Sequence, residues 1–232
     1  MHAADAEWVT APGRHKNHAE MLAHQYRSAL ELRHATGQAV DEALAERALR
    51  SLRNAGDRAH SLNAYPAAVG FYAAAADLAS TGSREHGRLL FLLGRSRYLG
   101  GDDHPESLEA ATAALLECGD QQTAAESEAV LAQLTWLRGD AEASLGHRSL
   151  ALKLVEASDP TPVKAFVISV AARYLSLAGG AEEAIRVGRG ALAMGALLPL
   201  VQVRARAWND TGMSRAHLGP PRGLDAVEPA VA

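Results

Sequence analysis

Small and apolar residues alternate with polar ones at helical spacing through residues 56–75, which read GDRAHSLNAYPAAVGFYAAA. Successive small or aromatic positions here are three, four, two, three, four and three residues apart: Gly56, Ala59, Asn63, Tyr65, Ala68, Tyr72 and Ala75. This spacing predicts two antiparallel helices with a join between them. Small residues recur where two helix backbones must touch, and the tyrosines fill the space beside them.

The same arrangement returns about every forty residues along the chain. A small residue follows a mid-helix apolar one at steps of 38, 38, 40 and 40 residues: Gly56, Gly94, Ala132, Ala172 and Gly212. A turn residue lies seven positions after each of them: Asn63, Gly101, Gly139, Gly179 and Gly219. Two features that share one period predict a helical repeat protein, and the alternative is an irregular helical bundle.

Glycine and proline mark the predicted helix ends, because glycine closes a helix in the left-handed conformation and proline is tolerated in a first turn. The predicted helices cover 17–35, 40–63, one starting at Pro66, 84–99, 105–118, 121–138, 140–157, 162–178, 181–195 and 200–218. The predicted organisation is a disordered tail or linker over 1–16, an N-terminal capping helix over 17–36, repeats over 37–219, and an incomplete last repeat or tail over 220–232. We expect about five antiparallel helix pairs in a right-handed all-α solenoid, with an N-terminal extra helix.

Composition agrees with a helical fold. The 232 residues are 48% hydrophobic, with Ala and Leu prominent and aromatics at 5%, which favours helix over strand. The formal net charge of −4 argues against a general nucleic-acid binder. The N-terminal segment lacks the apolar core of a signal peptide, and no window approaches eighteen consecutive apolar residues. We therefore expect a cytoplasmic protein without a membrane span.

The repeat resembles the tetratricopeptide repeat (TPR), in which one pair of antiparallel helices stacks on the next. Residues 56–75 match that pattern best, and Trp208, Gly212 and Gly219 match its start and turn in the last repeat. The forty-residue step is longer than the usual repeat of about 34 residues, which suggests a helix-extended subclass. HAEMLAHQYRSALEL, followed by AERALRSLRNAGDRAHSLNAYPAAVGFYAAAADL, resembles the C-terminal repeat region of large actinobacterial-type signalling ATPases.

Those ATPases join a nucleotide-binding module to a cyclase-like or helix-turn-helix output domain, and the present sequence departs from them. It contains no G-x-x-x-x-G-K-[ST] loop, no identifiable cyclase carboxylate pair and no basic recognition helix. The resemblance thus implies the sensor or regulatory TPR arm of such a protein, without enzyme activity or a cofactor. The alternatives are a free-standing TPR adaptor and, third, a small-molecule-sensing or metal-binding helical protein.

A concave wall formed by the first helix of each pair is the expected binding surface, since such walls take a peptide or a partner helix. Counted from the small-residue positions, its predicted outward residues are Arg50, Arg53, His60, Arg88, Arg95, Tyr98, Gln133, Trp136, Arg173, Arg206 and Asn209. Arginine pairs with carboxylates through its planar fork. We expect this groove to bind an acidic or C-terminal peptide, or an acidic domain; the alternative is a solvated arginine face.

Candidates for chemistry are few. His15 and His18 are spaced to chelate a metal across one turn, and His24 and His34 lie nearby, but no acidic partner or H-E-x-x-H helix accompanies them. The Asp102-Asp103-His104 cluster is typical of turns and helix caps. Cys118 is the only cysteine, which excludes a disulfide within the chain, and no G-x-S-x-G elbow is present. The weakly capped C-terminal end has three explanations: a fragment of a larger regulator, a homo-oligomer interface, or a tail folded onto the last repeat.

Overall fold

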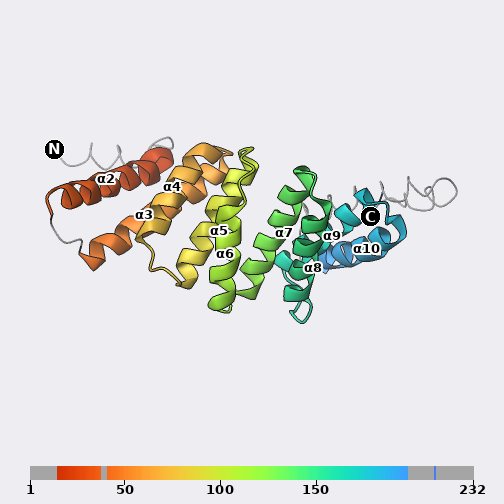
Figure 1. Cartoon of the computed structure of the whole chain (residues 1–232). Helices are drawn as coiled ribbons and strands as arrows, with labels where there is room; N and C mark the ends of the chain where they lie inside the picture. Colours follow the sequence, from red (N-terminus) through yellow and green to blue (C-terminus); the bar gives the residue numbers. More distant parts are fainter. Residues whose placement is uncertain (1–14, 38–40, 198–211, 213–232) are drawn as a thin grey trace. The chain divides into compact units, whose positions relative to one another are not determined.

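The computed structural model describes residues 15–37, 41–197 and 212, and all regular structure within them is α-helical. The helices are α2 (His15–Ala35), α3 (Glu42–Ser61), α4 (Tyr65–Leu78), α5 (Arg84–Leu99), α6 (Glu106–Glu117), α7 (Gln121–Leu137), α8 (Ala141–Val155), α9 (Pro162–Leu177) and α10 (Ala181–Leu197) (Figure 1). The predicted all-α class is confirmed. None of these described helices is long and apolar enough to cross a membrane.

The predicted pairing of helices is also observed. The pairs α3–α4, α5–α6, α7–α8 and α9–α10 each pack together, and α2 packs on α3. Helix α4 begins one residue before Pro66, which lies in its first turn as expected. The predicted helix over 200–218, which would open a fifth pair, lies outside the described residues apart from Gly212.

Helix starts are set by side chains that replace missing backbone partners. In five helices the N-cap side chain accepts a hydrogen bond from a backbone N–H of the first turn. These N-caps are Asp41 in α3, Ser83 in α5, Asp120 in α7, Asp140 in α8 and Thr161 in α9. Each cap acts within the first turn of its own helix, so a local interaction stabilises these starts.

The turn within each pair has a left-handed residue at the predicted position. The φ angles are 58° at Asn63, 86° at Gly101, 82° at Gly139 and 87° at Gly179. A residue with a Cβ atom meets a steric penalty in this conformation, so glycine and asparagine are preferred. Four turns of the predicted period are thus confirmed, and Gly219 lies outside the described residues.

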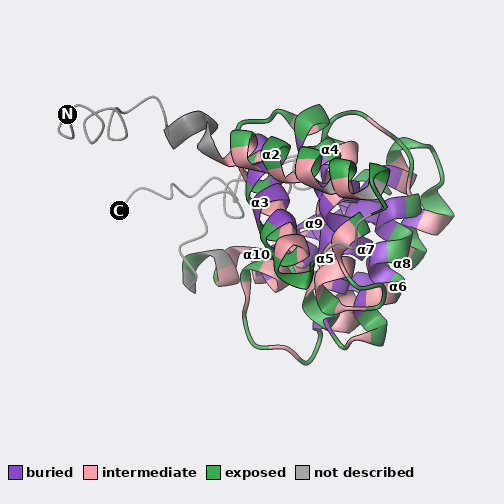
Figure 2. Ribbon diagram, turned by 90° about the vertical axis from the view of Figure 1, so that its left-hand side faces the viewer, coloured by how far each residue is buried: buried purple, intermediate pink, exposed green. Residues whose placement is uncertain are grey.

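The chain divides into two compact units, Met1–Cys118 and Gly119–Ala232, called the first and second unit below. In the first unit the helices pack in chain order around a core that includes Leu52, Tyr72 and Leu89. A Cβ atom on Gly94 would lie 2.6 Å from Cγ of Leu108, so α5 and α6 approach closely at the predicted small residue. Buried residues, purple in Figure 2, lie on the sides where the helices meet.

In the second unit α7 packs against both α8 and α9, and α9 packs against α10. Val155, Val167 and Val170 belong to its core. The repeat position Ala132 is fully buried, and its carbonyl accepts a hydrogen bond of 2.7 Å from Ser144 Oγ of α8. The small residue therefore admits the neighbouring helix here as glycine does in the first unit.

Candidate binding surface on the first helices

The first helices of successive pairs lie side by side in each unit and exchange side-chain contacts. In the first unit α3 and α5 are joined by Arg53–Glu85 and by His60 with Arg95 and Ser96. We call Arg50, Arg53, His60, Arg88, Arg95 and Tyr98, with the acidic residues that pair with them, the α3–α5 surface. It gathers side chains that are far apart in sequence.

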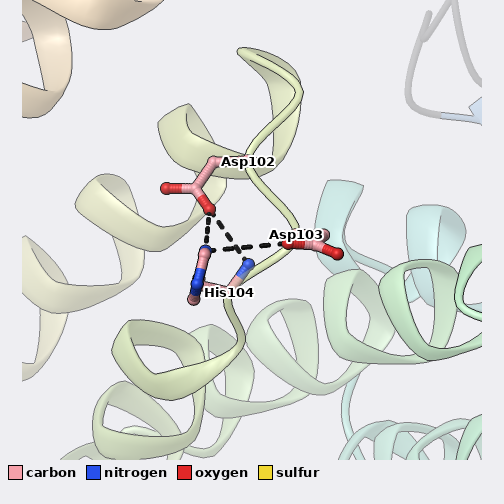
Figure 3. Close-up of side chains that lie close together, drawn as sticks. All are labelled: Asp102, Asp103 and His104. Atoms are coloured by element: carbon pink, nitrogen blue, oxygen red, sulfur yellow. Dashed lines mark hydrogen bonds and ion pairs between the residues drawn. The ribbon is translucent and has the colours of Figure 1, made fainter.

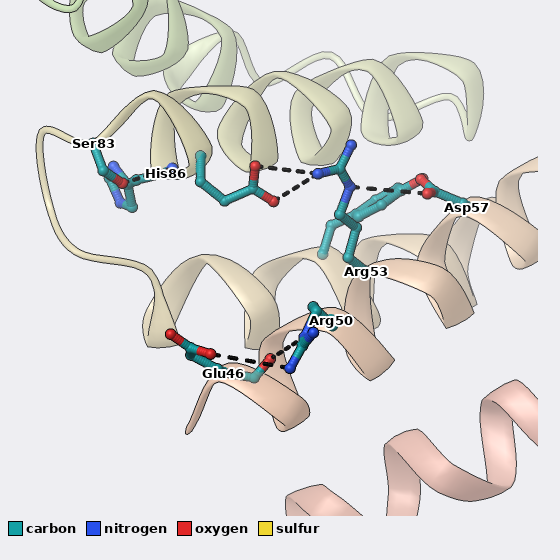
Figure 4. A network of polar contacts seen from close by, with 8 residues as sticks. Glu46, Arg50, Arg53, Asp57, Ser83 and His86 are labelled. Atoms are coloured by element: carbon teal, nitrogen blue, oxygen red, sulfur yellow. Dashed lines mark hydrogen bonds and ion pairs between the residues drawn. The ribbon is translucent and has the colours of Figure 1, made fainter. Parts of the chain in front are cut away.

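Arg53 is held by two carboxylates rather than presented free. Its Nη1 donates to Glu85 Oε1 at 2.8 Å and to Oε2 at 3.1 Å, and its Nε lies 3.9 Å from Asp57 Oδ2 (Figure 4). Asp57 Oδ1 also accepts a 2.7 Å hydrogen bond from the Tyr72 hydroxyl. Burial and this hydrogen bond raise the pKa of Tyr72, so it stays protonated and donates. The network ties α3 to both α4 and α5.

His60 forms a second contact between α3 and α5 on the same surface, with Arg95. Arg95 Nη2 lies 3.2 Å from His60 Nε2, and His60 Nδ1 lies 2.9 Å from Ser96 Oγ. Burial, and next the charge of Arg95, lower the pKa of His60, while Asp57 opposes the shift. His60 is therefore neutral near pH 7, with Nε2 accepting from Arg95 and Nδ1–H donating to Ser96. Arg95 also lies 5.4 Å from the ring centroid of Phe91.

Arg50 is the most exposed arginine of the α3–α5 surface. Its side chain is 69% exposed, and its nearest acid, Glu46 on the same helix, lies 4.0 Å away (Figure 4). An exposed pair at this distance contributes little binding energy, so a carboxylate from a partner can replace it. Arg88 and Tyr98 are half-buried on α5.

In the second unit, two residues that we predicted to face outward are instead buried or half-buried. Gln133 is 6% exposed and its Nε2 donates to the carbonyl of Ala129 at 3.2 Å, so the prediction that it faces outward is wrong. Trp136 is half-buried, with its ring centroid 5.3 Å from that of Tyr174, and it packs against the core of the unit. At Trp136 the covering helix is α9, which carries Tyr174. Arg173 is exposed as expected.

Arg206 and Asn209 lie outside the described residues, as do the side chains of His15, His18 and His34. His24 is exposed and lies 3.2 Å from Arg27, with its ring edge-on to Phe71 at 5.8 Å. These contacts belong to the packing of α2.

The Asp102-Asp103-His104 cluster is a turn closed by its own hydrogen bonds (Figure 3). His104 Nδ1 lies 2.5 Å from Asp102 Oδ1, the His104 backbone N–H donates to the same oxygen at 3.1 Å, and Asp103 lies 3.6 Å away. The hydrogen bond to Asp102 raises the pKa of His104 and lowers that of Asp102. Because the His104 imidazole is hydrogen-bonded to the Asp102 carboxylate, the geometry agrees with the predicted turn-forming role.

Sequence reasoning missed the acidic half of the α3–α5 surface. Asp57 lies four residues after Arg53, a spacing that signals an ion pair on one helix. Glu85 lies thirty-two residues after Arg53 on another helix, and only the packing of α3 beside α5 brings the two together. The surface is therefore a mixed network with a basic excess.

No protein-family model matches the sequence, and no curated protein matches it either. Solved structures do match the fold. BtubC (BKLC) from P. vanneervenii is similar over 94% of this chain and 89% of its own, with 16% identity and a TM-score of 0.71. A Podosopora anserina protein described as a kinesin light chain with nearly identical TPR-like repeats is similar over 77% and 91%, with 14% identity and a TM-score of 0.61. The fold of this chain is thus TPR-like, as the repeat predicts.

Proposed function

We propose that this chain is a non-catalytic protein-interaction scaffold that binds acidic peptide segments on the first helices of its repeats. The observation that supports it most is the α3–α5 surface. There the Arg50 side chain is exposed, and on the same surface the guanidinium groups of Arg53 and Arg95 are held in place by neighbouring side chains. An exposed guanidinium such as that of Arg50 can donate to both oxygens of a carboxylate through its planar fork, which favours recognition of acidic side chains.

A partner must add to the existing network rather than dismantle it. Glu85 binds Arg53 through both carboxylate oxygens, so this pair supports the surface and is a poor target for exchange. Arg50 and, in the second unit, Arg173 are exposed. We therefore assign the direct contacts with acidic residues to Arg50 in the first unit and, as a separate contact, to Arg173 in the second. Arg53, His60 and Arg95 hold α3 beside α5.

The role we propose is the sensor or regulatory arm of a cytoplasmic ATPase, transcriptional regulator or cyclase-type signalling protein. It rests on the sequence resemblance and on the TPR-like fold. The alternative is a free-standing adaptor with the same binding surface. The neighbouring coding sequence distinguishes them: an adjacent P-loop ATPase or cyclase frame favours the first, and an unrelated operon favours the second.

A comparative pull-down tests the binding function. The whole chain and its Arg50→Glu/Arg173→Glu double variant serve as baits in extract from the source cell, with Arg138→Glu as the control. Arg138 is exposed at the α7–α8 turn and is not one of the residues assigned to the proposed contacts. We expect mass spectrometry to find partners with acidic segments that the control retains and the double variant loses. Identical captures by all three baits would contradict the proposal.

A further inference from the structure

A shallow groove that is open to solvent lies between α8 and α9 of the second unit. Its volume is about 460 Å³, within the usual range for small-ligand pockets. It is lined by Ser149, Leu152, Lys153, Val155, Glu156, Lys164 and Ile168. On α8 these residues follow at helical spacing, so they form one stripe that faces α9.

The lining combines an aliphatic floor with a cationic rim. Leu152 and Ile168 are half-buried and Val155 is buried, so the floor is already largely removed from water. Lys153 and Lys164 line the groove, and they are two of the three lysines in the whole chain. With Glu156 as the one acid in the lining, two ammonium groups face one carboxylate.

The ammonium groups of Lys153 and Lys164 differ in how many N–H donors remain available to a ligand. Lys164 Nζ donates to the carbonyls of Glu156 at 2.9 Å and Ser158 at 2.6 Å, which leaves one of its three N–H groups. Lys153 is exposed and forms no ion pair or hydrogen bond with its side chain in the described part of the second unit. An anion placed between them would receive charge-assisted hydrogen bonds from both.

The groove is separate from the surface proposed to bind peptides. On α9, Lys164 and Ile168 lie nine and five residues before Arg173. At 3.6 residues per turn these offsets place them about 180° and about 140° around the helix from Arg173. A ligand in the groove therefore leaves the side of α9 that carries Arg173 accessible.

We propose that this groove binds an aliphatic monocarboxylate of medium chain length. The carboxylate lies at Lys153 and Lys164, and the hydrocarbon covers the half-buried Leu152 and Ile168. The α8 stripe from Ser149 to Glu156 spans about 10 Å at 1.5 Å per residue, which suits a chain of this length. Ser149 and Glu156 form the polar edge, and the carboxylate of Glu156 disfavours a second anionic group on the ligand.

The test is a titration of the full chain with octanoate, followed by two-dimensional NMR of backbone amides. Butyrate and octylamine serve as the short-chain and charge-reversed probes. We expect octanoate to shift the amides of α8 and α9 around Lys153 and Ile168, with butyrate and octylamine at least fivefold weaker by the loss of apolar contact and of charge complementarity. Binding of octylamine as tight as that of octanoate would overturn the proposal.

Two variants locate the site. Lys153→Gln should weaken octanoate binding about fivefold and Ile168→Ala about tenfold. Lys153 is exposed, so its variant should fold normally even if Ile168→Ala loses stability. Glu142→Gln, exposed near the start of α8 and outside the groove, is the control. Unchanged octanoate affinity in Lys153→Gln, or shifts confined to other helices, would show that the groove is not the site.

Discussion

A Cβ atom on Gly56 would lie 2.6 Å from Cε1 and 2.7 Å from Cδ1 of the Tyr72 ring. Tyr72 is 1% exposed and its hydroxyl donates to Asp57, so the ring has no free direction in which to move. The contact between α3 and α4 therefore requires glycine, and it supports the same Asp57 that faces Arg53 on the proposed binding surface.

Gly56→Ala should lower the free energy of unfolding by about 2 kcal/mol, because the added methyl overpacks a filled site. Gly70→Ala is the matched control, since Gly70 lies in α4 with open space where the methyl carbon of alanine would lie. The control should gain about 0.8 kcal/mol from helix propensity. Urea denaturation measures both, and equal stabilities for the two variants would refute the close packing.

Two glycines of the second unit test whether the repeated turn requires a left-handed residue. Gly139 and Gly146 both have open space where a Cβ atom would lie, but Gly139 has a φ of 82°. Gly139→Ala should cost about 1 kcal/mol because alanine is strained in the left-handed conformation. Gly146→Ala, inside α8, should instead gain about 0.8 kcal/mol. Thermal unfolding of both variants checks the sign of each change.

Acidification should destabilise the first unit through His60. Burial and Arg95 lower the pKa of His60 in the folded chain, whereas an unfolded histidine titrates near the ordinary value of about 6.5. The unfolded state then binds more protons, so stability is retained above pH 6.5 and falls as the pH drops below it toward the folded pKa. His104 has a raised pKa and acts in the opposite direction, so the comparison needs a variant.

His60→Gln supplies that variant because it keeps His104 and every other titrating group. The free energy of unfolding, measured from pH 7.5 down to pH 5, should fall less steeply in His60→Gln than in the parent chain. Parallel pH profiles would mean that His60 titrates at the same pKa in the folded and unfolded states.

Two neighbouring residues of α8, His147 and Arg148, should respond oppositely to substitution. Glu128 has a side chain that is 5% exposed and lies 2.7 Å from His147 Nδ1, so His147→Ala leaves a buried carboxylate poorly compensated and should cost about 3 kcal/mol.

Arg148 is 8% exposed, forms no ion pair among the described residues, and has a pKa lowered by burial. Arg148→Met should therefore stabilise the chain by about 1 kcal/mol. Chemical denaturation compares the two, and a loss of stability in Arg148→Met would indicate that the guanidinium has a stabilising partner.

The repeat was predictable because its turn residues obey a local rule. The left-handed turn needs glycine or asparagine wherever it occurs, so Asn63, Gly101, Gly139 and Gly179 reveal the period directly. The helix starts were predictable for the same reason, because a capping side chain acts within its own turn.

The exposed faces were harder to predict, because the exposure of a side chain depends on where the neighbouring helices lie around that position, which the repeat period does not specify. Gln133 occupies the same repeat position as Arg95 and Arg173, yet Gln133 is buried, Arg95 is half-buried and Arg173 is exposed. The Arg53–Glu85 pair depends on the offset between α3 and α5, which no local spacing encodes. Sequence periodicity thus locates the helices but does not decide which of their polar residues meet.

The most direct test of the proposed function is the affinity of the chain for an acidic peptide, measured by fluorescence anisotropy. The probe is a labelled peptide of alternating glutamate and glycine, titrated with the full chain and with its variants. We predict saturable, salt-sensitive binding to each unit. Arg50→Glu should weaken binding to the first unit and Arg173→Glu binding to the second, each about fivefold, whereas Arg138→Glu changes both less than about twofold. Equal affinities for all three variants, or no saturable binding to the parent chain, would contradict recognition of acidic peptides by the first helices.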